Sequence, residues 1–569
     1  MQARSLGNRL LQGTFWHPIE PLLFAACFYR PADEHALMPT VPIMMGLHFL
    51  WLGLARWQIL PLYAALLLKG WTRRGSWLSL SAPASLALLS LTLSALVPRL
   101  LPLPPRGPYK VATVVEHVRI QGAQEFVMQV FYPVDRSAIS ASPFFPAKRK
   151  AVFPGKPWAK RVPFRHSLGG LVAAGATSLV QHKRGVQGSE HLIAQAAVLG
   201  CLCLACDVYE TANRLSLRYP YVDVGGRFTR SLARCLKMPQ VIWSHMSLFD
   251  MPALDGGLLH GAKPCFPMSK SAGPVVLWLH GLLGGRSMYS MYAAELAANG
   301  CVVFCPEHTD GSAVLSVLPD GTEKHYETSP HKALSDEERH WRGQQLEARV
   351  AEVGAVIDEV DLLASGENTQ LSHLAQVGGA SIVDSSHVVL MGHSFGGTTA
   401  VEALCAMQPG GKLASHSTKL KATILLDPWT FPLSDKARAL SIQLPLLIAS
   451  NKSFLGEEGR AREAALAAAA TAQTLRLSLE NSHHQNMSDA GLFSPELARR
   501  TKAVGPCDPL EFTDNLMELI ISMVAVHARG GGTPRQRALA SGKETVVDAT
   551  VLFASGGPPS VADTSLKSS

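Results

Sequence analysis

The sequence predicts an α/β protein built on a doubly wound, mostly parallel sheet, and two observations carry this prediction. From Pro274 onward, short apolar runs alternate with segments of helical period, which is the pattern of repeated strand–helix–strand units. Around Ser394, a buried apolar strand changes within a few residues into a helix. In such a sheet ligands bind at the carboxyl ends of the strands, so the candidate site is expected in the loops that follow them.

The segment around Ser394 has the form of a nucleophile elbow. Val388–Met391 predicts a buried strand, residues 392–396 read G-H-S-F-G, and a helical period follows as far as Pro409. The glycines fit this turn because the serine takes a strained conformation and flanking side chains would crowd the strand or the helix. The pattern predicts an α/β-hydrolase fold with Ser394 as its nucleophile. The alternative is a Gly-rich turn with an ordinary serine.

The length and composition of the chain limit the classes of function that it can have. The chain has 569 residues, which leaves room for one large catalytic domain and additional segments. Its net charge is +8 with 17% charged and 47% hydrophobic residues, which indicates a membrane connection and favours an anionic lipid surface. Neither zinc-finger spacing nor a long basic run argues for nucleic acid. Cys201, Cys203 and Cys206 lie in an apolar run and are interpreted as packed thiols, while disulfides stay undecided.

Residues 1–104 are interpreted as a hydrophobic N-terminal region with one to three candidate transmembrane helices. Trp77–Val97 carries no charge and is long enough to span, since a bilayer takes roughly 20 helical residues. Ile43–Leu68 is interrupted by polar residues and a proline, and Thr14–Tyr29 is less apolar. A buried or interfacial helix is the alternative for each segment. The start of the chain does not have the pattern of a signal peptide.

A short basic loop at residues 69–74 separates two of these segments. By the positive-inside rule this loop would lie in the cytoplasm, which puts the large C-terminal part on the other side. The sequence therefore predicts a membrane-anchored protein with its catalytic domain on the lumenal or extracellular side.

The predicted catalytic domain covers residues 105–529 and begins after a proline-rich boundary. Residues 140–273 show no clear period and are interpreted as an insertion, either a lid-like region or a surface insertion. Residues 530–569 are rich in Gly, Ser and Ala and predict a disordered tail. Strands are expected at Tyr109–Val114, Phe126–Tyr132, Val275–Leu279, Cys301–Cys305, Thr423–Leu426, Leu444–Ala449 and Thr474–Leu479, and helices at Ser290–Ala298, Ser335–Leu363 and Ala461–Ala472.

An activated serine needs a base within hydrogen-bond reach and a carboxylate that orients the base. In this fold the three residues follow in the order Ser, Asp, His. Asp427 ends the strand directly after the elbow helix, and a carboxylate there is costly unless it is paired. The histidine must follow a later strand, where only His483 and His484 lie.

Three other residues are rejected as triad members because of their position in the sequence. Asp435 lies eight residues past Asp427, His387 precedes the elbow strand, and the side chain of His393 is expected to point away from the pocket. The alternatives to a triad are a turn carboxylate at Asp427 and a polar loop at the histidine pair.

The oxyanion hole is expected from two backbone N–H groups. One belongs to Phe395, the residue after the nucleophile. For the other we choose Leu282, because Gly281 ahead of it lets the backbone approach; a plain strand-end turn is the alternative reading of this loop. Such chemistry predicts neither a metal nor a cofactor.

Six motifs stand out along the catalytic domain: H-G-L-L-G-G at 280–285, E-H-T-D-G-S-A at 307–313, H-x-R-x-x-Q at 340–345, G-H-S-F-G-G at 392–397, L-D-x-W-x-F-P-L at 426–433 and H-Q-N-x-x-D at 484–489. The last two are far more specific than the elbow. Together these motifs resemble the plasma-type platelet-activating factor acetylhydrolases, over about residues 107–525.

The resemblance implies that Ser394 is the nucleophile, Asp427 the orienting acid and His484 the base, with Leu282 and Phe395 as oxyanion donors. It also implies a calcium-independent serine esterase of the 1-alkyl-2-acetylglycerophosphocholine esterase type. Such an enzyme removes acetyl or short or oxidised sn-2 acyl groups from phosphocholine lipids through an acyl-enzyme.

The sequence departs from the family in four places. A proline follows Asp427, and Asp427 lies further from Ser394 than is expected for the family. Residues 140–273 align poorly, and the secreted members lack the hydrophobic N-terminal region. These departures bear on acyl-chain preference and location. A broader phospholipase or lipase, and a non-catalytic binding protein on the same fold, are the alternative functions. The physiological lipid, the number of spans and the oligomeric state stay open.

Overall fold

The structure is a computed structural model. It describes residues 60–71, 85–87, 89–90, 105–120, 125–134, 218–224, 226–243, 246, 250–256, 272–377, 382–451, 454–493, 495–540 and 545–548. The chain forms two compact units. The first comprises residues 1–101, 155–217 and 239–249, and the second comprises residues 102–154, 218–238 and 250–569. The second unit contains the sheet and all the predicted site residues.

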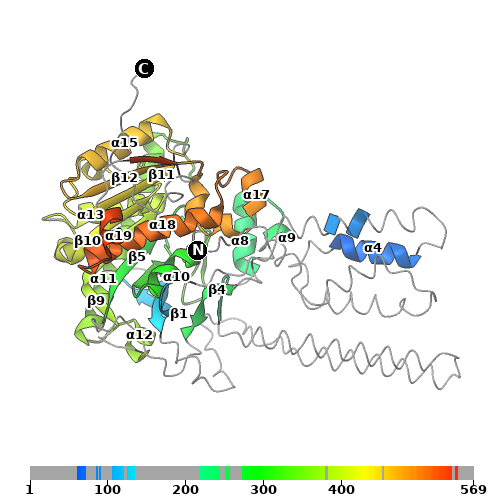
Figure 1. The fold of residues 1–569 in the computed structure, drawn as a ribbon, viewed down its shortest axis with the longest axis horizontal. Helices are drawn as coiled ribbons and strands as arrows, with labels where there is room; N and C mark the ends of the chain where they lie inside the picture. Colours follow the sequence, from blue (N-terminus) through cyan, green and yellow to red (C-terminus); the bar gives the residue numbers. More distant parts are fainter. Residues whose placement is uncertain are drawn as a thin grey trace. The chain divides into compact units, whose positions relative to one another are not determined.

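The first unit bears on the predicted membrane segments. Its longer described helix is α4, Leu60–Trp71, which overlaps the end of Ile43–Leu68 and continues through Lys69 (Figure 1). Twelve residues of helix measure roughly 18 Å, less than the roughly 30 Å of a bilayer's hydrocarbon core. Among the described residues, no helix has the length and apolarity needed to cross a membrane. Thr14–Tyr29 and most of Trp77–Val97 lie outside the described residues, so the membrane prediction gains no support.

The second unit is built on an eleven-stranded sheet in the order β13-β12-β11-β10-β9-β5-β6-β2-β1-β4-β3. Its strands are β1 Lys110–Arg119, β2 Glu125–Val134, β3 Arg218–Pro220, β4 Asp250–Asp255, β5 Gly273–Leu279, β6 Val302–Pro306, β9 Val383–His393, β10 Leu420–Leu426, β11 Leu446–Asn451, β12 Thr474–Glu480 and β13 Thr545–Asp548. A separate hairpin pairs β7 Leu315–Val317 with β8 Glu323–His325.

From β13 to β6 all neighbouring strands are parallel, and β2 is antiparallel to β6. The predicted mostly parallel sheet is therefore confirmed. The chain runs from β5 to β6, then crosses back to β9 on the other side of β5. This reversal makes the gap after β5 and β9 the topological switch point, where such sheets bind ligands.

The helices cover the sheet on both faces. They are α8 Gly226–Leu236, α10 Ser290–Ala298, α11 Asp336–Ser365, α12 Ser372–Val377, α13 Phe395–Ala406, η8 Ala414–Lys419, α14 Asp435–Arg438, α15 Gly456–Ala468, η9 His484–Met487, α16 Ala490–Phe493, α17 Pro495–Arg500, α18 Pro509–Met523, η10 Val524–Ala528 and α19 Pro534–Ala540, with α9 Gln240–Trp243 in the first unit. Right-handed crossovers put α10 on one face and α11 and α13 on the other. In agreement, α11 packs on α13, and α10 packs on α18 (Figure 1).

The longest helix, α11, is well delimited by its sequence. The Ser335 hydroxyl accepts the N–H of Glu338 at its start, which is the first of the two hydrogen bonds of a capping box. The Glu338 carboxylate accepts the N–H of Leu334, one residue before the position expected for a capping box. Gly366 ends the helix with a φ of 78°, a left-handed conformation that glycine adopts at little cost.

Two predicted regions are more structured than expected. Within residues 140–273, β3 and β4 extend the sheet beyond β1 and α8 joins the same unit, so this region is not wholly an insertion. Within residues 530–569, helix α19 forms and β13 pairs with β12. The predicted disordered tail therefore included residues that form regular structure. The edge of β12 has unpaired backbone groups, and β13 forms hydrogen bonds with them.

Candidate active site

Strand register brings the loops of the site together. Leu279 of β5 pairs with Gly392 of β9, and Leu426 of β10 pairs with His393, so all three strands end at one level. Ser394 follows β9 directly, and its backbone N–H donates to Leu426 O at 2.9 Å. The residues that follow these strands must therefore meet above the switch point.

Ser394 has the geometry of a nucleophile elbow. Its φ is 57° and its ψ −120°, a conformation that costs energy for any residue with a side chain. A side chain at Gly396 would overlap the carbonyl of Leu279 on the neighbouring strand. The flanking glycine is needed for this reason, as predicted. Ser394 is 6% exposed, so only a small part of its surface is open to an incoming substrate.

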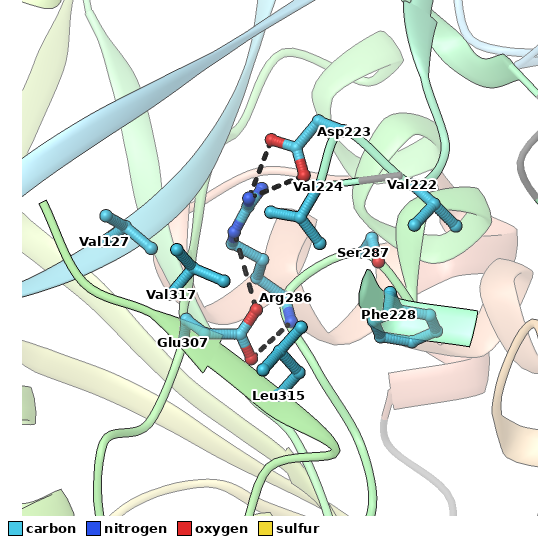
Figure 2. Close-up of a pocket in the computed structure, with 10 residues that line it drawn as sticks. All are labelled: Val127, Val222, Asp223, Val224, Phe228, Arg286, Ser287, Glu307, Leu315 and Val317. Atoms are coloured by element: carbon cyan, nitrogen blue, oxygen red, sulfur yellow. Dashed lines mark hydrogen bonds and ion pairs between the residues drawn. The ribbon is translucent and has the colours of Figure 1, made fainter. Parts of the chain in front are cut away.

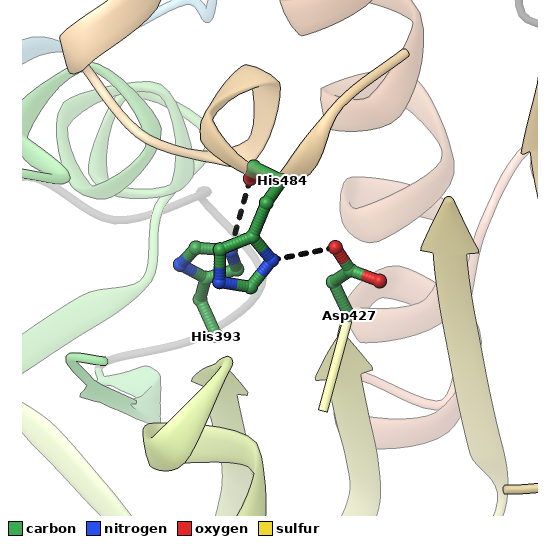
Figure 3. A group of neighbouring side chains, drawn as sticks. All are labelled: His393, Asp427 and His484. Atoms are coloured by element: carbon green, nitrogen blue, oxygen red, sulfur yellow. Dashed lines mark hydrogen bonds and ion pairs between the residues drawn. The ribbon is translucent and has the colours of Figure 1, made fainter. Parts of the chain in front are cut away.

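Asp427 and His484, the predicted acid and base, lie within hydrogen-bond distance of each other. His484 Nδ1 is 2.6 Å from Asp427 Oδ2 (Figure 3). Asn451 donates to the same carboxyl group through its backbone N–H at 3.2 Å and through its side-chain amide. Burial raises the pKa of Asp427 well above its usual value, and the backbone donor of Asn451 opposes this shift. The hydrogen-bond donors hold the carboxyl group in one orientation.

The imidazole of His484 is held between two rings. Phe454 stacks on it with a centroid distance of 3.5 Å, and the ring of His393 lies at 4.4 Å. Burial lowers the pKa of His484 to about 3, which keeps the ring neutral and able to accept a proton. Among the hydrogen bonds of the described residues, none joins Ser394 Oγ to this ring. Such bonds often tighten only when a substrate binds.

His393 does not point away from the site, which corrects the expectation from sequence. Its Nδ1 is 2.9 Å from Tyr289 Oη, and its Nε2 is 3.1 Å from the carbonyl oxygen of His484. Both ring nitrogens are thus engaged, so His393 cannot serve as the base. The hydrogen bonds, and not its position in the chain, exclude it.

His393, Asp427 and His484 bring atoms of the metal-ligand type within 4.8 Å of one another. Figure 3 shows that Asp427 and His484 are bonded to each other, and that His393 is bonded to the backbone of His484. These contacts fit an oriented base better than an ion site, so we assign no metal to the cluster.

The proposed oxyanion donors lie on two adjoining segments. A Cβ built on Gly281 would lie 2.9 Å from Ser394 Cβ, so glycine lets this loop reach the nucleophile. The N–H of Gly281 donates to Tyr289 Oη at 3.2 Å and is not available to a substrate. Among the described residues, the N–H groups of Leu282 and Phe395 have no protein acceptor. The sequence predicted these two N–H groups as the oxyanion donors, and that role stays a prediction.

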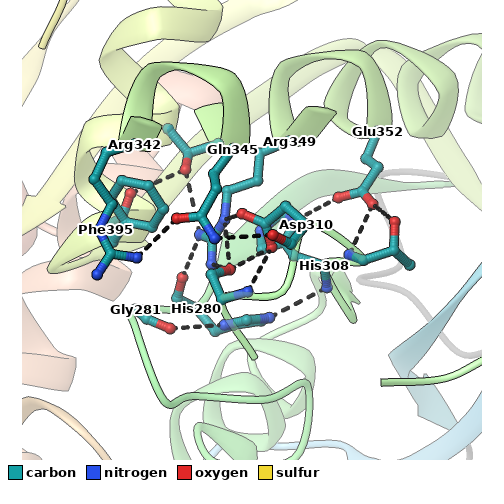
Figure 4. A network of polar contacts seen from close by, with 12 residues as sticks. His280, Gly281, His308, Asp310, Arg342, Gln345, Arg349, Glu352 and Phe395 are labelled. Carbon is teal, nitrogen blue, oxygen red and sulfur yellow. Dashed lines mark hydrogen bonds and ion pairs between the residues drawn. The ribbon is translucent and has the colours of Figure 1, made fainter. Parts of the chain in front are cut away.

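Arg349 of α11 connects the two segments that carry these donors (Figure 4). Its Nη1 donates to His280 O at 2.7 Å, and its guanidinium carbon lies 4.6 Å from the centre of the Phe395 ring. Asp310 pairs with Arg349 at 2.8 Å. Arg349 is fully buried, and a buried cation is stable only with such partners. The side chain therefore holds together the two segments that carry the predicted oxyanion donors.

Further polar contacts hold the E-H-T-D loop against α11. Glu352 lies 2.6 Å from His308 Nδ1 and accepts the backbone N–H of Thr309 at 3.0 Å. Gln345 donates to Asp310 O at 2.8 Å. Burial raises the pKa of Glu352 to about 7, and the Thr309 hydrogen bonds oppose this shift.

A small pocket lies beside the loop that follows β5 (Figure 2). Apolar side chains form most of its wall, with Arg286 and two acids beside them: Val127, Val222, Asp223, Val224, Phe228, Arg286, Ser287, Glu307, Leu315 and Val317. Arg286 binds both carboxylate oxygens of Asp223, at 2.8 and 2.7 Å. Burial raises the pKa of Glu307 to about 8, against the effect of Arg286. The ion pairs join residues 221–224 to this loop.

The sequence comparisons agree with the geometry. Residues 252–527 match the profile of the family described as platelet-activating factor acetylhydrolase, isoform II. The predicted family resemblance is confirmed. The platelet-activating factor acetylhydrolase of Gallus gallus is 28% identical over 263 residues, 42% of this chain and 58% of that protein. That of Cavia porcellus is 28% identical over 189 residues, 32% of this chain and 40% of that protein.

A putative phospholipase A2 of Schizosaccharomyces pombe is 26% identical over 218 residues, 33% of this chain and 47% of that protein. The chain thus spans about half the length of the relatives it matches. Among solved structures, a ferulic acid esterase from Streptomyces cinnamoneus aligns with a TM-score of 0.47 and 16% identity, over 76% of this chain and 93% of that one. The fold assignment rests on strand order and the elbow, not on this likeness.

Three residues near the triad were missed as functional residues in the sequence. Tyr289 accepts the N–H of Gly281, and Arg349 donates to the carbonyl of His280; both of these partners lie in the loop after β5, residues 280–285, which we call the oxyanion loop. Phe454 stacks on His484. An arginine amid the apolar positions of α11 was the available signal for Arg349, because buried arginines require partners. Neither Tyr289 nor Phe454 stands out from an ordinary core aromatic in the sequence.

Proposed function

We propose that this protein is a serine esterase that cleaves acyl esters of phospholipids through an acyl-enzyme. The observation that carries the proposal is the His484–Asp427 contact beside a serine in elbow conformation. The substrate class follows the relatives named above, and we propose platelet-activating factor-like lipids with an acetyl or short or oxidised sn-2 chain.

The chemistry assigns each group one task. His484 Nε2 takes the proton of Ser394 Oγ as this oxygen attacks the ester carbonyl, while Asp427 holds the other ring nitrogen. The N–H groups of Leu282 and Phe395 donate to the oxyanion. His484 then gives its proton to the departing lysolipid oxygen, which leaves the acyl group on Ser394. Water, activated by the same imidazole, releases the acid.

The test is chain-length-resolved phospholipid hydrolysis by the full chain and by Ser394→Ala. The wild type should hydrolyse sn-2 acetyl and short-chain lipids and bind an organophosphonate covalently at Ser394. The variant should lose both, and substantial residual turnover would exclude Ser394 as the nucleophile. Hydrolysis of sn-1 and long-chain esters at similar rates would favour the broader phospholipase that the S. pombe relative suggests.

We also propose that hydrolysis is independent of calcium, because backbone N–H groups meet the charge of the oxyanion. Strong chelation should leave the rate unchanged, and a requirement for added calcium would contradict the proposal. Membrane anchoring, with the catalytic domain on the lumenal or extracellular side, is a separate proposal that rests on the N-terminal sequence. The full chain should then resist carbonate extraction from membranes.

A further inference from the structure

A chain of three hydrogen bonds connects the two halves of the site. The N–H of Gly281, in the oxyanion loop, is 3.2 Å from Tyr289 Oη. Tyr289 Oη is 2.9 Å from His393 Nδ1, and His393 Nε2 is 3.1 Å from the carbonyl oxygen of His484. The two ends belong to the loop after β5 and to the loop after β12, about 200 residues apart in the sequence.

The direction of every bond in this chain is fixed by the groups at its ends. The N–H of Gly281 can only donate, and the carbonyl of His484 can only accept. His393 must therefore carry its proton on Nε2, which leaves Nδ1 as an acceptor. Tyr289 Oη accepts from Gly281 and donates to that Nδ1. In the opposite tautomer, the unprotonated Nε2 would face the carbonyl oxygen of His484, and two acceptors cannot form a hydrogen bond.

Burial keeps this arrangement in one protonation state. Tyr289 and His393 are 3% and 2% exposed. Burial raises the pKa of Tyr289 above its usual value and lowers that of His393 well below its usual value. A positive charge on His484 would also lower the pKa of His393, so the two imidazoles do not both carry a charge. No other orientation of these polar atoms satisfies them all.

We propose that Tyr289 and His393 form a positioning pair that couples the oxyanion loop to the loop of the catalytic base. This inference rests on the proposed esterase function. Among the described residues, neither side chain forms a hydrogen bond with Ser394 Oγ, although the ring of His393 also packs 4.4 Å from the imidazole of His484. Their hydrogen bonds set the placement of Leu282, directly after Gly281, relative to the imidazole of His484. Both must be aligned with Ser394 Oγ in the same transition state, so loss of one link should disturb both.

The test is a double-mutant cycle in the full chain with Tyr289→Phe, His393→Leu and the double variant. Phenylalanine keeps the ring that packs 5.4 Å from Trp278 and removes only the hydroxyl group. Turnover is measured on a soluble short-chain aryl ester, together with the rate of organophosphonate labelling at Ser394. Tyr132→Phe is the matched control, since Tyr132 is equally buried but lies on β2, outside this chain of bonds.

Each single variant should lower kcat on the order of ten-fold, because a buried donor or acceptor loses its partner. The double variant should also lose about ten-fold and not about a hundred-fold, because the residues act through one chain. KM should be nearly unchanged. Additive losses, or an effect confined to KM or to the melting temperature, would overturn the positioning pair while leaving the esterase proposal intact.

The hydrogen-bond chain can also be tested without an activity assay, through the protonation state of His393. Nitrogen-15 NMR of histidine-labelled full chain should show His393 neutral, protonated at Nε2, from pH 5 to 8. A proton on Nδ1, or titration near pH 6.5, would overturn the inferred chain. If the wild type neither turned over esters nor bound the organophosphonate, the proposed function would fail, and with it the kinetic role of the pair.

Discussion

The two sides of the candidate site are held in different ways. On the triad side, Ser394, Asp427 and His484 follow the ends of strands β9, β10 and β12, and Asp427 is held by Asn451 at the end of β11 and by His484. On the oxyanion side, one loop is anchored from behind by Arg349 of α11. The proposed reacting groups lie at strand ends, so their order along the chain was enough to predict them. The groups that hold the other side come from a distant helix.

The largest effect should come from the triad side. Asp427→Asn should lower kcat by on the order of 10³- to 10⁴-fold, because an amide no longer holds His484 in the tautomer that accepts a proton from Ser394. KM on a soluble ester should change little. The control is Asp435→Asn, whose side chain is 83% exposed and pairs with Arg339 on the surface. Equal losses in the two variants would show that Asp427 has no special role.

A second prediction uses the buried acid on the oxyanion side. Glu352 has a pKa raised to about 7 by burial, against an ordinary value of 4.5 in the unfolded chain. Between these values the unfolded state loses its proton while the folded state keeps it, so stability falls as pH rises. The stability that the protonated carboxyl contributes is fully present below pH 4.5 and is lost by about pH 7.

Glu352→Gln should therefore flatten the fall in unfolding free energy between pH 4.5 and 7.5. The pH-dependent part of the stability that this substitution removes is on the order of 3 kcal/mol, from the difference between the ordinary pKa of 4.5 and the raised pKa of about 7. Denaturant unfolding at several pH values measures it. Glu347→Gln, an exposed position on the same helix, is the control and should leave the slope unchanged. Identical slopes in the wild type and Glu352→Gln would contradict the prediction.

The third prediction tests the anchor itself. Arg349→Lys keeps the charge but cannot contact His280 O and Asp310 with one planar group while stacking on Phe395. The oxyanion donors should lose alignment, and kcat should fall by about 30-fold, which is less than the roughly 100-fold minimum for losing one donor because both N–H groups remain. The measurement is kcat with a thermal melt for each variant.

The control for Arg349→Lys is Arg339→Lys on the same helix, where the arginine pairs with exposed carboxylates. This exchange should cost little in rate, because surface ion pairs contribute little. If Arg349→Lys matched it in rate, the oxyanion loop would hold its shape without the arginine. The contrast between the two sides of the site would then disappear.

The sequence predicted those parts of the site that follow from chain order. Asp427 could be chosen because an unpaired carboxylate is costly at the end of an apolar strand, and Leu282 because a glycine precedes it. Arg349 could not be assigned, since sequence spacing does not show which carbonyl a buried arginine meets 69 residues away. His393 was misjudged because backbone position alone does not show where a ring turns.

Fold prediction had the same limits. Apolar runs located the central parallel strands, because strands buried on both faces read as continuous hydrophobic segments. Short edge strands such as β3 and β13 were missed, since three or four residues give no measurable period. Element ends also shifted: the strand expected at Leu444–Ala449 runs from Leu446 to Asn451. Asn451 thereby reaches Asp427.

The smallest effect should come from the residue next to the base. His483 points away from Asp427: its Nδ1 lies 2.9 Å from the carbonyl oxygen of Lys502. Its backbone N–H donates to the side chain of Asn486 at 2.8 Å, and this bond survives any substitution except proline. His483→Ala therefore loses one partly exposed hydrogen bond, worth about 1 kcal/mol or less. The turn that carries His484 should keep its shape.

The same substitution one residue later should have a very different result. His484→Ala removes the group that bonds Asp427 and should lower kcat by on the order of 10³-fold or more, whereas His483→Ala should lower it only a few-fold. Both losses are read as kcat on one soluble short-chain ester, with folding checked by thermal melt. If His484→Ala kept its kcat and His483→Ala lost it, His483 and not His484 would be the base, and the His484–Asp427 contact would have no catalytic role. Because the two residues share one turn, any general damage to the loop would lower both rates together, so a large difference between them can only report which imidazole accepts the proton of Ser394.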